Sequence, residues 1–552
     1  EAVGGRVHFS TVHSFCNRVI HAYERRQGQT LRRIETEEQE GGKARILREI
    51  YQSFNHSRAG DDELDTLASE IGTVKNEMVR NVAAFRAQTR NFSLIFKAYE
   101  NFKREHRLID FDDMLCYAYS ILRKCPDILQ TYRRRCRYIQ VDEGQDLSKI
   151  QFEILSLLGG DPSPNLYIVA DDDQSIYGFR GAAPQYVLNF ADRYAGSQTF
   201  RLETNYRSSR DIVDLSSRFI RGNRNRMDKN HQASNGPAGK PCVVGVADEP
   251  AQTEYILKTF SALAAKEHAL TAAVIYRNNL SAVALVDALE RRGVSFRVRQ
   301  SRMHFFSHWV VQDVRTIFRF ARDQTDAQAF RSIYYKIKRY ISKAMIEHAD
   351  TVTGGESYID ALLDFPNLQP YQLKQLGELK EEFSRLARMQ PALAMDWIDS
   401  EFSYGEYMED FCEKTHASHT CATNVFGVLR CIAAKCATIA ELEERLNSLD
   451  EMFRSGELAR RRASLTLTTM HSAKGLEFDC VFLIDLTGDE IPGDVRDGAL
   501  TGDMAMEEER RLFYVGLTRA RRHLYLVYPR NRGGVPAAKS PFVGEAAACL
   551  AV

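Results

Sequence analysis

The chain has 552 residues, of which 44% are apolar, and its 74 basic side chains balance its 74 acidic ones. This length predicts several domains of ~150 residues each, and the apolar content is enough for folded cores, which excludes a disordered chain. The balanced charge excludes nucleic-acid binding through net charge alone, so any site for a polyanion has to be a local groove.

The cysteines and the lengths of the apolar runs indicate the cellular compartment of the protein. Eleven cysteines are scattered without a disulfide framework, and no apolar run reaches the ~18 residues that a membrane span needs. The first residues also lack the charged and then apolar pattern of a signal segment. We therefore expect a cytoplasmic protein that has no membrane association.

Strand and helix patterns alternate near both ends of the chain. The first strands are predicted in "RVHFST", "CRYIQVDE" and "NLYIVADDD", with a helix from Val12. Further strands are predicted in "TAAVIYRNN", "SFRVRQ", "SLTLTTMH", "DCVFLIDL" and "HLYLVYP". Between them, the stretches from Tyr23 to Arg107 and from Thr325 to Arg462 repeat apolar positions three and four apart, which is typical of helices. The sequence thus predicts an α/β fold with two α/β domains, each carrying a helical insertion.

The segment "YIQVDEGQD" ends a predicted strand with two neighbouring carboxylates. Asp142 could hold a hydrated Mg²⁺ while Glu143 polarises the attacking water of a nucleotide hydrolase. Such a pair normally faces a phosphate loop of the form G-x-x-x-x-G-K-[ST]. The 552 residues contain no match to this pattern, because Gly42-Lys43 and Gly239-Lys240 are followed by Ala and Pro.

The segment "VADDDQSIYGFRGA" combines a polar residue suited to phosphate with residues suited to DNA. Gln174 could reach a γ-phosphate or its attacking water. Tyr177, Phe179 and Arg180 form an aromatic and basic face that suits unstacked bases and their backbone.

Two arginines elsewhere are also suited to phosphate. In "LETNYRSS", Arg207 offers a guanidinium beside Tyr206, whose ring can stack on a purine. In "EEERRLFYVGLTRARRHLYL", Arg519 could neutralise the charge that develops on a transferred phosphoryl group.

Eight motifs in the same order make the sequence resemble the superfamily 1A DNA helicases of the UvrD, PcrA and Rep type. They are "STVHSF", "LIDFDDML", "VDEGQD", "VADDDQSIYGFRGA", "LETNYRS", "AAVIYRNN", "TMHSAKGLEF" and "EEERRLFYVGLTRA". The resemblance covers nearly the whole chain. It implies two RecA-like parallel-sheet motor domains, each with a helical inserted subdomain. It also implies ATP-driven, Mg²⁺-dependent movement along single-stranded DNA from 3′ to 5′, with unwinding at junctions of single and double strands.

The resemblance also sets domain bounds and implies a protein activator as a further partner. The expected bounds are 1–24 and 105–207 for the first motor domain, 25–104 for its insertion 1B, 208–322 and 463–552 for the second motor domain, and 323–462 for its insertion 2B.

By the same resemblance, individual residues take family roles. Asp142 matches the magnesium-holding acid and Glu143 the general base. Gln174 and Arg207 match γ-phosphate sensors, and Arg519 matches the arginine finger of the second motor domain. The residues that match nucleotide contacts are Tyr206, Gly475 and Glu477. Those that match DNA contacts are His13, Tyr177, Phe179, Arg180, Thr469 and His471.

The sequence departs from the family pattern at two places. Many relatives carry Trp at the position of Phe179, although a smaller ring still stacks. The segment "RNRGGVPAAKSPFVGE" has a Gly-rich turn where relatives often carry another aromatic residue, so the resemblance leaves the exit end of the DNA path open.

In this family the phosphate loop precedes the "STVHSF" motif, which begins here at Ser10. We therefore expect the sequence to be a piece of a longer protein that lacks roughly two strand-helix-strand units of ~30 residues. The 552 residues alone are then expected to hydrolyse little ATP. Two alternatives stay open: a non-catalytic DNA-binding or scaffold subunit with helicase architecture, and the helicase module of a helicase-nuclease.

One group of possible metal ligands lies outside the family motifs. It comprises Cys412, His416, His419 and Cys421, with Cys431 and Cys436 nearby. The spacing C-x3-H-x2-H-x-C is too tight for a standard zinc finger. We predict that these cysteines pack in the fold, although a metal site there stays open, and Mg²⁺ is the metal that we expect.

Overall fold

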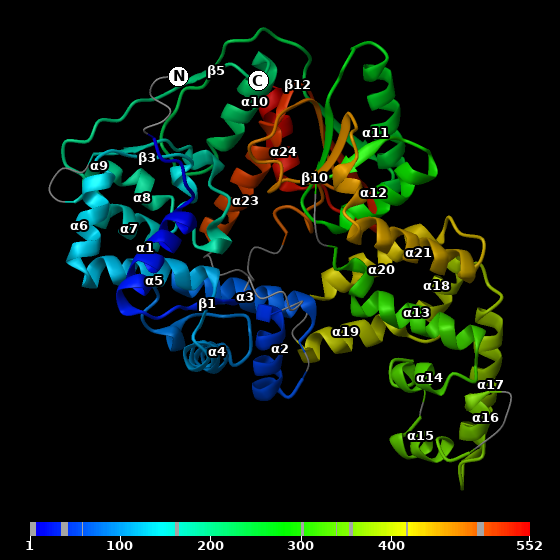
Figure 1. Cartoon of the computed structure of the whole chain (residues 1–552). Coiled ribbons are helices and arrows are strands. Elements are labelled where there is room, and N and C mark those ends of the chain that lie inside the picture. The colour runs from blue at the N-terminus through cyan, green and yellow to red at the C-terminus, as the bar shows by residue number, and fades with distance from the viewer. Residues whose placement is uncertain are drawn as a thin grey trace. The chain divides into compact units, whose positions relative to one another are not determined.

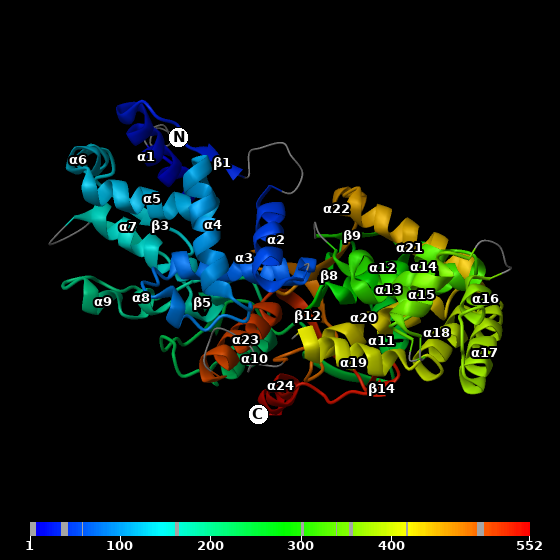
Figure 2. The same cartoon turned by 90° about the horizontal axis from the view of Figure 1, so that it is seen from below.

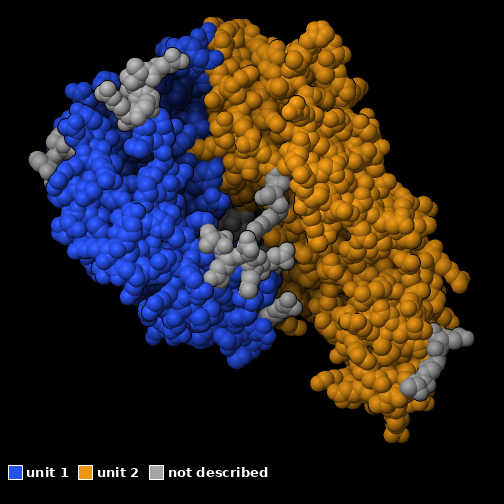
Figure 3. Space-filling model, in the orientation of Figure 1, with its two compact units in different colours: residues 1–206, 216–234, 494–515 blue, residues 207–215, 235–493, 516–552 orange. Residues whose placement is uncertain are grey.

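The computed structural model forms two compact units, which Figure 3 colours separately. It describes residues 7–34, 42–57, 59–160, 165–299, 303–337, 339, 341–352, 357–415, 418–493 and 502–551. Unit 1 comprises Glu1–Tyr206, Ser216–Ser234 and Asp494–Val515, and unit 2 comprises Arg207–Leu215, Asn235–Gly493 and Gly516–Val552. This is a division into two units, so the four-part division expected from the sequence stays a prediction.

Unit 1 has one core built around four helices and a short parallel strand pair. The helices are α1 (Val12–Gln27), α5 (Phe111–Lys124), α6 (Pro126–Arg135) and α7 (Lys149–Gly159). Their apolar faces share one cluster of buried residues. The Thr11 side chain accepts a hydrogen bond from the Ser14 N–H, which fixes the start of α1, and Gly28 ends it with φ +64. The pair β3 (Ile139–Val141) and β4 (Leu166–Ile168) lies beside these helices.

A second core in unit 1 belongs to three helices from the stretch predicted to be helical. They are α2 (Gly42–Asn55), α3 (Asp61–Asn76) and α4 (Phe92–His106), and they share a separate apolar cluster. Helix α2 contacts both α3 and α4 (Figures 1 and 2). Strands β1 (Arg32–Arg33) and β2 (Leu108–Ile109) pair in parallel where the chain enters and leaves this group. The insertion is therefore tied at both ends to the core that carries α1 and α5.

Shorter elements complete unit 1. They are the 3₁₀ turns η3 (Val82–Ala84), η4 (Gly144–Asp146), η5 (Asp172–Gln174) and η6 (Gly178–Arg180), the helices α8 (Gln185–Leu188) and α9 (Phe190–Arg193), and the parallel pair β5 (Thr204–Asn205) and β6 (Gln232–Ala233). Helices α10 (Arg210–Ile220) and α23 (Gly502–Leu517) each cross the division between the units. Within unit 1, Phe219 of α10 contacts Phe513 of α23 with ring centroids 5.1 Å apart.

Unit 2 is built on a six-stranded parallel sheet in the order β7-β12-β11-β8-β10-β9. The strands are β7 (Cys242–Val246), β8 (Ala272–Tyr276), β9 (Phe296–Val298), β10 (Leu465–Thr469), β11 (Phe478–Leu483) and β12 (Ala520–Pro529). Every residue of β8 and β10 is buried, as expected for central strands covered on both faces. Helix α11 (Glu249–Ala264) packs against β7 and β12 (Figure 1).

A large helical stretch lies between β9 and β10 in the sequence, as predicted. Its elements are η7 (Phe305–Ser307), α13 (Trp309–Arg322), α14 (Ala327–Ile333), α15 (Lys343–Ala349), α16 (Tyr358–Leu363), α17 (Pro370–Leu386), α18 (Pro391–Ser400), α19 (Tyr404–Thr415), α20 (His419–Ala433), α21 (Ile439–Arg454) and α22 (Glu457–Arg460). Helix α12 (Leu280–Arg291) contacts α20, and one apolar cluster runs from the sheet into these helices. The stretch is thus continuous with the core of the sheet.

The C-terminal part of unit 2 contains the Gly-rich turn noted in the sequence. Strands β13 (Asn531–Arg532) and β14 (Val535–Pro536) pair antiparallel and are joined by Gly533 and Gly534, with φ +57 and +86. Two consecutive positive φ values suit a two-residue hairpin turn, which explains the glycines. Helix α24 (Pro541–Leu550) follows.

The segment that precedes α1 differs from its prediction. The predicted strand in "RVHFST" is wrong for the described residues 7–11, which form no strand. Among the described residues these five have no strand neighbour, and Thr11 instead caps α1.

In the part of the chain that the structure describes, no helix has the length and apolar content to cross a membrane.

Candidate active site and DNA-contact segment

The two carboxylates predicted to act on nucleotide lie at the carboxyl end of β3. Asp142 and Glu143 follow Val141 directly, and both side chains are exposed. The Asp142 carboxylate accepts a hydrogen bond from the Glu143 N–H at 3.0 Å. Glu143 has φ +53, a left-handed conformation that costs a non-glycine residue of order 1 kcal/mol and is enriched at functional sites. The backbone thus turns sharply at the residue that matches the general base.

A chain of hydrogen bonds joins Glu143 to Gln174. The Gln145 side chain, 1% exposed, donates to the Glu143 carboxylate at 2.6 Å and accepts from the Asp171 N–H at 3.0 Å. The Gln174 amide then donates to the Asp171 carboxylate at 2.7 Å. Strands β3 and β4 are parallel, so the segments that follow them meet at one edge of the pair. The structure therefore brings the predicted base and the predicted phosphate sensor into one network.

Two basic side chains hold the acidic segment after β4. Lys229 Nζ lies 2.6 Å from carboxylate oxygens of both Asp171 and Asp172 and 2.9 Å from Asp173. Arg226 donates two hydrogen bonds of 2.8 Å to the Asp173 carboxylate. Burial opposes ionisation of Asp171, but the charge of Lys229 and the hydrogen bonds from Lys229 and Gln174 together outweigh burial and lower the pKa of that carboxyl. The acid that anchors Gln174 is therefore held ionised.

Sequence reasoning missed Lys229 and Arg226. They lie in "NRNRMDKN", a basic segment with no regular helix or strand pattern. Its charge was visible, but nothing in the spacing shows that it meets the acids some 55 residues upstream.

The aromatic and basic face predicted for DNA forms around η6. The rings of Tyr177 and Phe179 lie 6.1 Å apart, and the Arg180 guanidinium carbon lies 5.4 and 5.3 Å from their centroids. Phe179 is 44% exposed, so its ring is open to a partner from solvent. His13, on α1, meets the ring of Phe111 edge-on at 6.2 Å, and burial lowers its pKa. A ring pair with a cation beside it suits base stacking next to a phosphate backbone.

In unit 2, four predicted residues lie along the connection from β10 to β11. Thr469 ends β10, and its hydroxyl accepts from the Ser472 N–H at 3.2 Å. His471 follows it and is half-buried, and Gly475 adopts φ +79. Glu477 immediately precedes β11. The connection starts at the carboxyl end of a central parallel strand, where open α/β sheets bind ligands.

Glu477 is paired with two arginines. Its carboxylate lies 2.6 Å from Arg207 Nε and also accepts a hydrogen bond from Arg521. Hydrogen bonds from both arginines lower the pKa of Glu477, and the one from Arg521 has the larger effect. Tyr206, the residue before Arg207, has a ring that is 76% exposed. The structure thus brings the predicted sensor Arg207 to the predicted nucleotide contact Glu477.

Arg519 is buried, with 1% of its surface exposed. Its guanidinium donates to the Leu476 carbonyl at 3.2 Å and to the Thr518 hydroxyl at 2.9 Å. It therefore lies against the same connection that carries Gly475 and Glu477. A part in phosphoryl transfer stays a prediction for this residue.

The cysteine and histidine group is only partly described. Cys412 is buried on α19, while His419 and Cys421 are exposed on α20. The prediction that these cysteines pack is confirmed for Cys412 and Cys436, which are buried, and is wrong for the exposed Cys421. His416 lies outside the described residues, so a metal site there stays open. Within the described ranges, no three His, Cys, Asp or Glu side chains are arranged to hold a metal ion. Hydrated Mg²⁺ needs only one or two carboxylates, and the exposed Asp142 is of the right type.

Two protein-family models match successive parts of the chain. The model of the UvrD/REP helicase N-terminal domain matches residues 3–195, and that of the UvrD-like helicase C-terminal domain matches residues 200–531. The chain belongs to the UvrD-like helicase family. This confirms the resemblance and the predicted α/β fold class with two UvrD-like domains.

Three individual relatives share between 26% and 29% sequence identity with the chain. The chain is similar to YjcD of Bacillus subtilis (strain 168), with 29% identity over 493 residues, which cover 88% of this chain and 64% of YjcD. It is also similar to the ATP-dependent DNA helicase PcrA of the same organism, with 26% identity over 545 residues, 95% of this chain and 72% of PcrA. The DNA helicase II of Rickettsia typhi is 27% identical over 458 residues, 80% of this chain and 67% of that protein. The chain thus spans less than two thirds of YjcD.

Proposed function

We propose that the full-length protein is an ATP-dependent DNA helicase that moves along single-stranded DNA from 3′ to 5′ and unwinds duplexes at junctions. The observation that carries the proposal is the network from Glu143 through Gln145 and Asp171 to Gln174. A structural role alone would not require an exposed carboxylate at a left-handed position to be linked to the Gln174 amide, six residues after the end of β4. Family membership supports ATP and DNA as the ligands, and the direction rests on the family resemblance.

The nucleotide chemistry is divided among a few residues. Glu143 accepts a proton from the attacking water, and Gln174 reports the γ-phosphate to the base through Asp171. Arg207 and Arg519 neutralise charge on the phosphates, while Tyr206 stacks on the base of the nucleotide. Mg²⁺, held through Asp142, would offset charge on the phosphate oxygens when it is bound with ATP.

DNA is the second ligand that we propose for the protein. The contact residues in the proposal are His13, Tyr177, Phe179, Arg180, Thr469 and His471. A protein activator is a further proposed partner. The free cysteines fit a reducing cytoplasm as the compartment.

The test uses partial duplexes with a single-stranded tail on either the 3′ or the 5′ side. The full-length protein should unwind the 3′-tailed substrate, and only with ATP and Mg²⁺ present. Equal unwinding of both substrates would contradict the direction, and unwinding without ATP would contradict the motor.

Phe179→Ala tests the DNA-contact segment in the full-length protein. Loss of one stacked base should weaken single-strand binding by ~1–3 kcal/mol and slow translocation. ATP turnover at saturating DNA should fall much less, because no catalytic group is removed. Fluorescence titration, DNA-saturated ATPase and melting temperature are measured on the same variant. A parallel fall in all three would show that Phe179 is a packing residue instead.

A further inference from the structure

The turn η6, which carries Phe179, is held by hydrogen bonds on both sides. On one side, the Gly178 N–H donates to the Glu508 carboxylate of α23 at 2.8 Å. On the other, the Phe179 carbonyl accepts from Ser69 Oγ and from Thr73 Oγ1, each at 3.2 Å. Both hydroxyls belong to α3 of the helical insertion. A carbonyl oxygen has two lone pairs, so the two donors together satisfy it.

Neighbouring atoms leave little room for the backbone of the turn to shift. A Cβ added at Gly178 would lie 2.3 Å from the Glu508 carboxylate. A Cβ added at Gly181, which has φ +80, would lie 2.8 Å from Cβ of Asn76 on α3. The turn therefore touches α3 at its backbone as well as through the hydroxyls.

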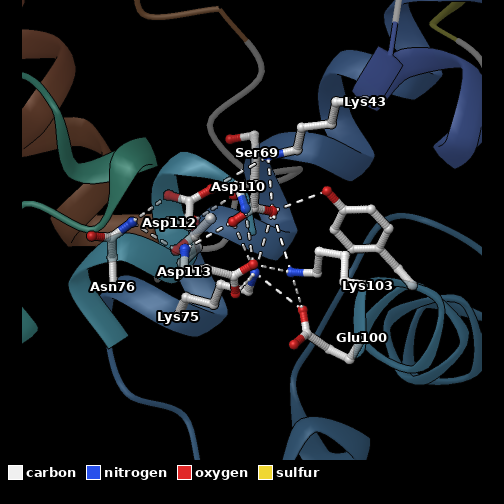
Figure 4. Close-up of polar contacts among 12 residues, drawn as sticks. Lys43, Ser69, Lys75, Asn76, Glu100, Lys103, Asp110, Asp112 and Asp113 are labelled. Atoms are coloured by element: carbon white, nitrogen blue, oxygen red, sulfur yellow. Dashed lines mark hydrogen bonds and ion pairs between the residues drawn. The ribbon is translucent and has the colours of Figure 1, made fainter. Parts of the chain in front are cut away.

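Helix α3 is itself anchored by buried charges (Figure 4). Lys75 lies 3.2 Å from the Asp110 carboxylate and 2.7 Å from that of Asp113, and Lys103 of α4 lies 2.6 Å from Asp113. In Figure 4 both lysines point toward the acids at the start of α5. Because this cluster is buried, α3 offers its hydroxyls from a fixed position.

We infer that Ser69 and Thr73 are positioning residues of the helical insertion, which set the backbone of Phe179 so that its ring meets a DNA base. The inference rests on the proposed function, because it takes Phe179 as a DNA contact. Thr73 is buried, and its single hydroxyl proton is shared between the Ser69 carbonyl at 3.0 Å and the Phe179 carbonyl at 3.2 Å, so it links the turn to the helix. Without the hydroxyls the Phe179 carbonyl loses its two α3 donors, which favours displacement of the turn.

The experiment compares full-length wild type with Ser69→Ala/Thr73→Val. The probe is an oligothymidylate that carries one 2-aminopurine, whose fluorescence falls when it stacks. Loss of two hydrogen bonds should weaken binding by about 5–10-fold. The quench at saturating protein should shrink, and the DNA concentration for half-maximal ATPase should rise by the same factor. The ATPase rate at saturating DNA should stay close to that of wild type.

Two further variants separate positioning from general damage. Ser53→Ala/Thr131→Val removes the same two kinds of hydroxyl where each donates, among the described residues, to a carbonyl of its own helix, and it should behave as wild type. Restoring one hydroxyl, as Ser69→Ala/Thr73→Ser, should recover most of the quench. A parallel loss of DNA affinity, saturated ATPase rate and melting temperature in the first variant would overturn the inference.

Phe179→Ala separates this inference from the proposed function. If Phe179→Ala weakens binding and Ser69→Ala/Thr73→Val leaves affinity and quench unchanged, the positioning role is wrong and the DNA contact stands. If Phe179→Ala itself leaves both unchanged, the DNA contact is wrong and the positioning role falls with it.

Discussion

Replacing Glu143 by glutamine in the full-length protein should cut ATP turnover about 10²–10⁴-fold and leave Mg-ATP binding largely intact. The amide cannot accept a proton from the attacking water, yet it keeps the size of the side chain and can still hydrogen-bond to Gln145. Glu143 is exposed at the end of β3, so the change removes little packing. Steady-state ATPase and equilibrium binding of a fluorescent ATP analogue measure the two effects.

Asp142→Asn is the matched control, because it makes the same carboxylate-to-amide change at the neighbouring residue. Here metal-dependent nucleotide binding should weaken, since an amide is a poorer magnesium ligand than a carboxylate. If both variants lost nucleotide affinity equally while turnover at saturation stayed unaltered, the division of roles between the two acids would be wrong.

Asp110→Ala should destabilise the helical insertion and α5 by about 3–5 kcal/mol, the range for breaking a buried ion pair. Asp110 is 0% exposed, and its carboxylate lies 3.2 Å from Lys75 and 3.4 Å from Lys103. It also caps α5 by accepting from the Asp113 N–H at 2.8 Å. Alanine removes the cap and leaves the buried lysines short of negative charge. Hydrogen–deuterium exchange of α3, α4 and α5 in the full-length protein measures the loss of protection.

Asp127→Asn is the control for this prediction. Asp127 pairs with Arg26 on the surface of the same unit, and exposed pairs contribute little to stability. We expect no measurable change in exchange. Protection of α5 in Asp110→Ala equal to that of wild type would show that the buried cluster does not stabilise the insertion.

The same cluster predicts a dependence on pH. Burial opposes ionisation of Asp110, but the charges of Lys75, Lys43 and Lys103 outweigh burial and hold the pKa of Asp110 well below its ordinary value. Because the folded pKa is lower than the unfolded one, the stability from this carboxylate is fully present above about pH 5 and is lost as pH falls further. The difference in protection between wild type and Asp110→Ala should therefore stay constant from neutrality to about pH 5 and shrink as the pH is lowered further.

The sequence predicts local features of this fold better than contacts between distant segments. The central strand β8 is an apolar run and β10 alternates Leu with the β-branched Thr, so both segments favour strands, and both are buried. The stretch "RVHFST" shows the limit, because a strand pattern needs a hydrogen-bonded neighbour that a local pattern cannot reveal. In the described residues 7–11 the pattern forms no strand.

The candidate site shows the same limit. Asp142, Glu143 and Gln174 could be found because each follows a predicted strand within a motif. Lys229 could not be assigned to Asp171, since the pairing joins segments 58 residues apart. The hydroxyl of Ser69 meets the Phe179 carbonyl across 110 residues, and neither its type nor its spacing marks it as special. Such contacts follow from how helices pack, which a single sequence does not show.

Translocation of the full-length protein on single-stranded DNA tests the central claim most directly. Oligothymidylates of increasing length carry a fluorophore at either the 5′ or the 3′ end, and the signal is followed after ATP and Mg²⁺ are added. We predict that the time to reach the 5′ fluorophore increases linearly with length, that the 3′ fluorophore shows no such delay, and that Glu143→Gln abolishes the movement. Arrival times that do not depend on length at either end would contradict an ATP-driven motor.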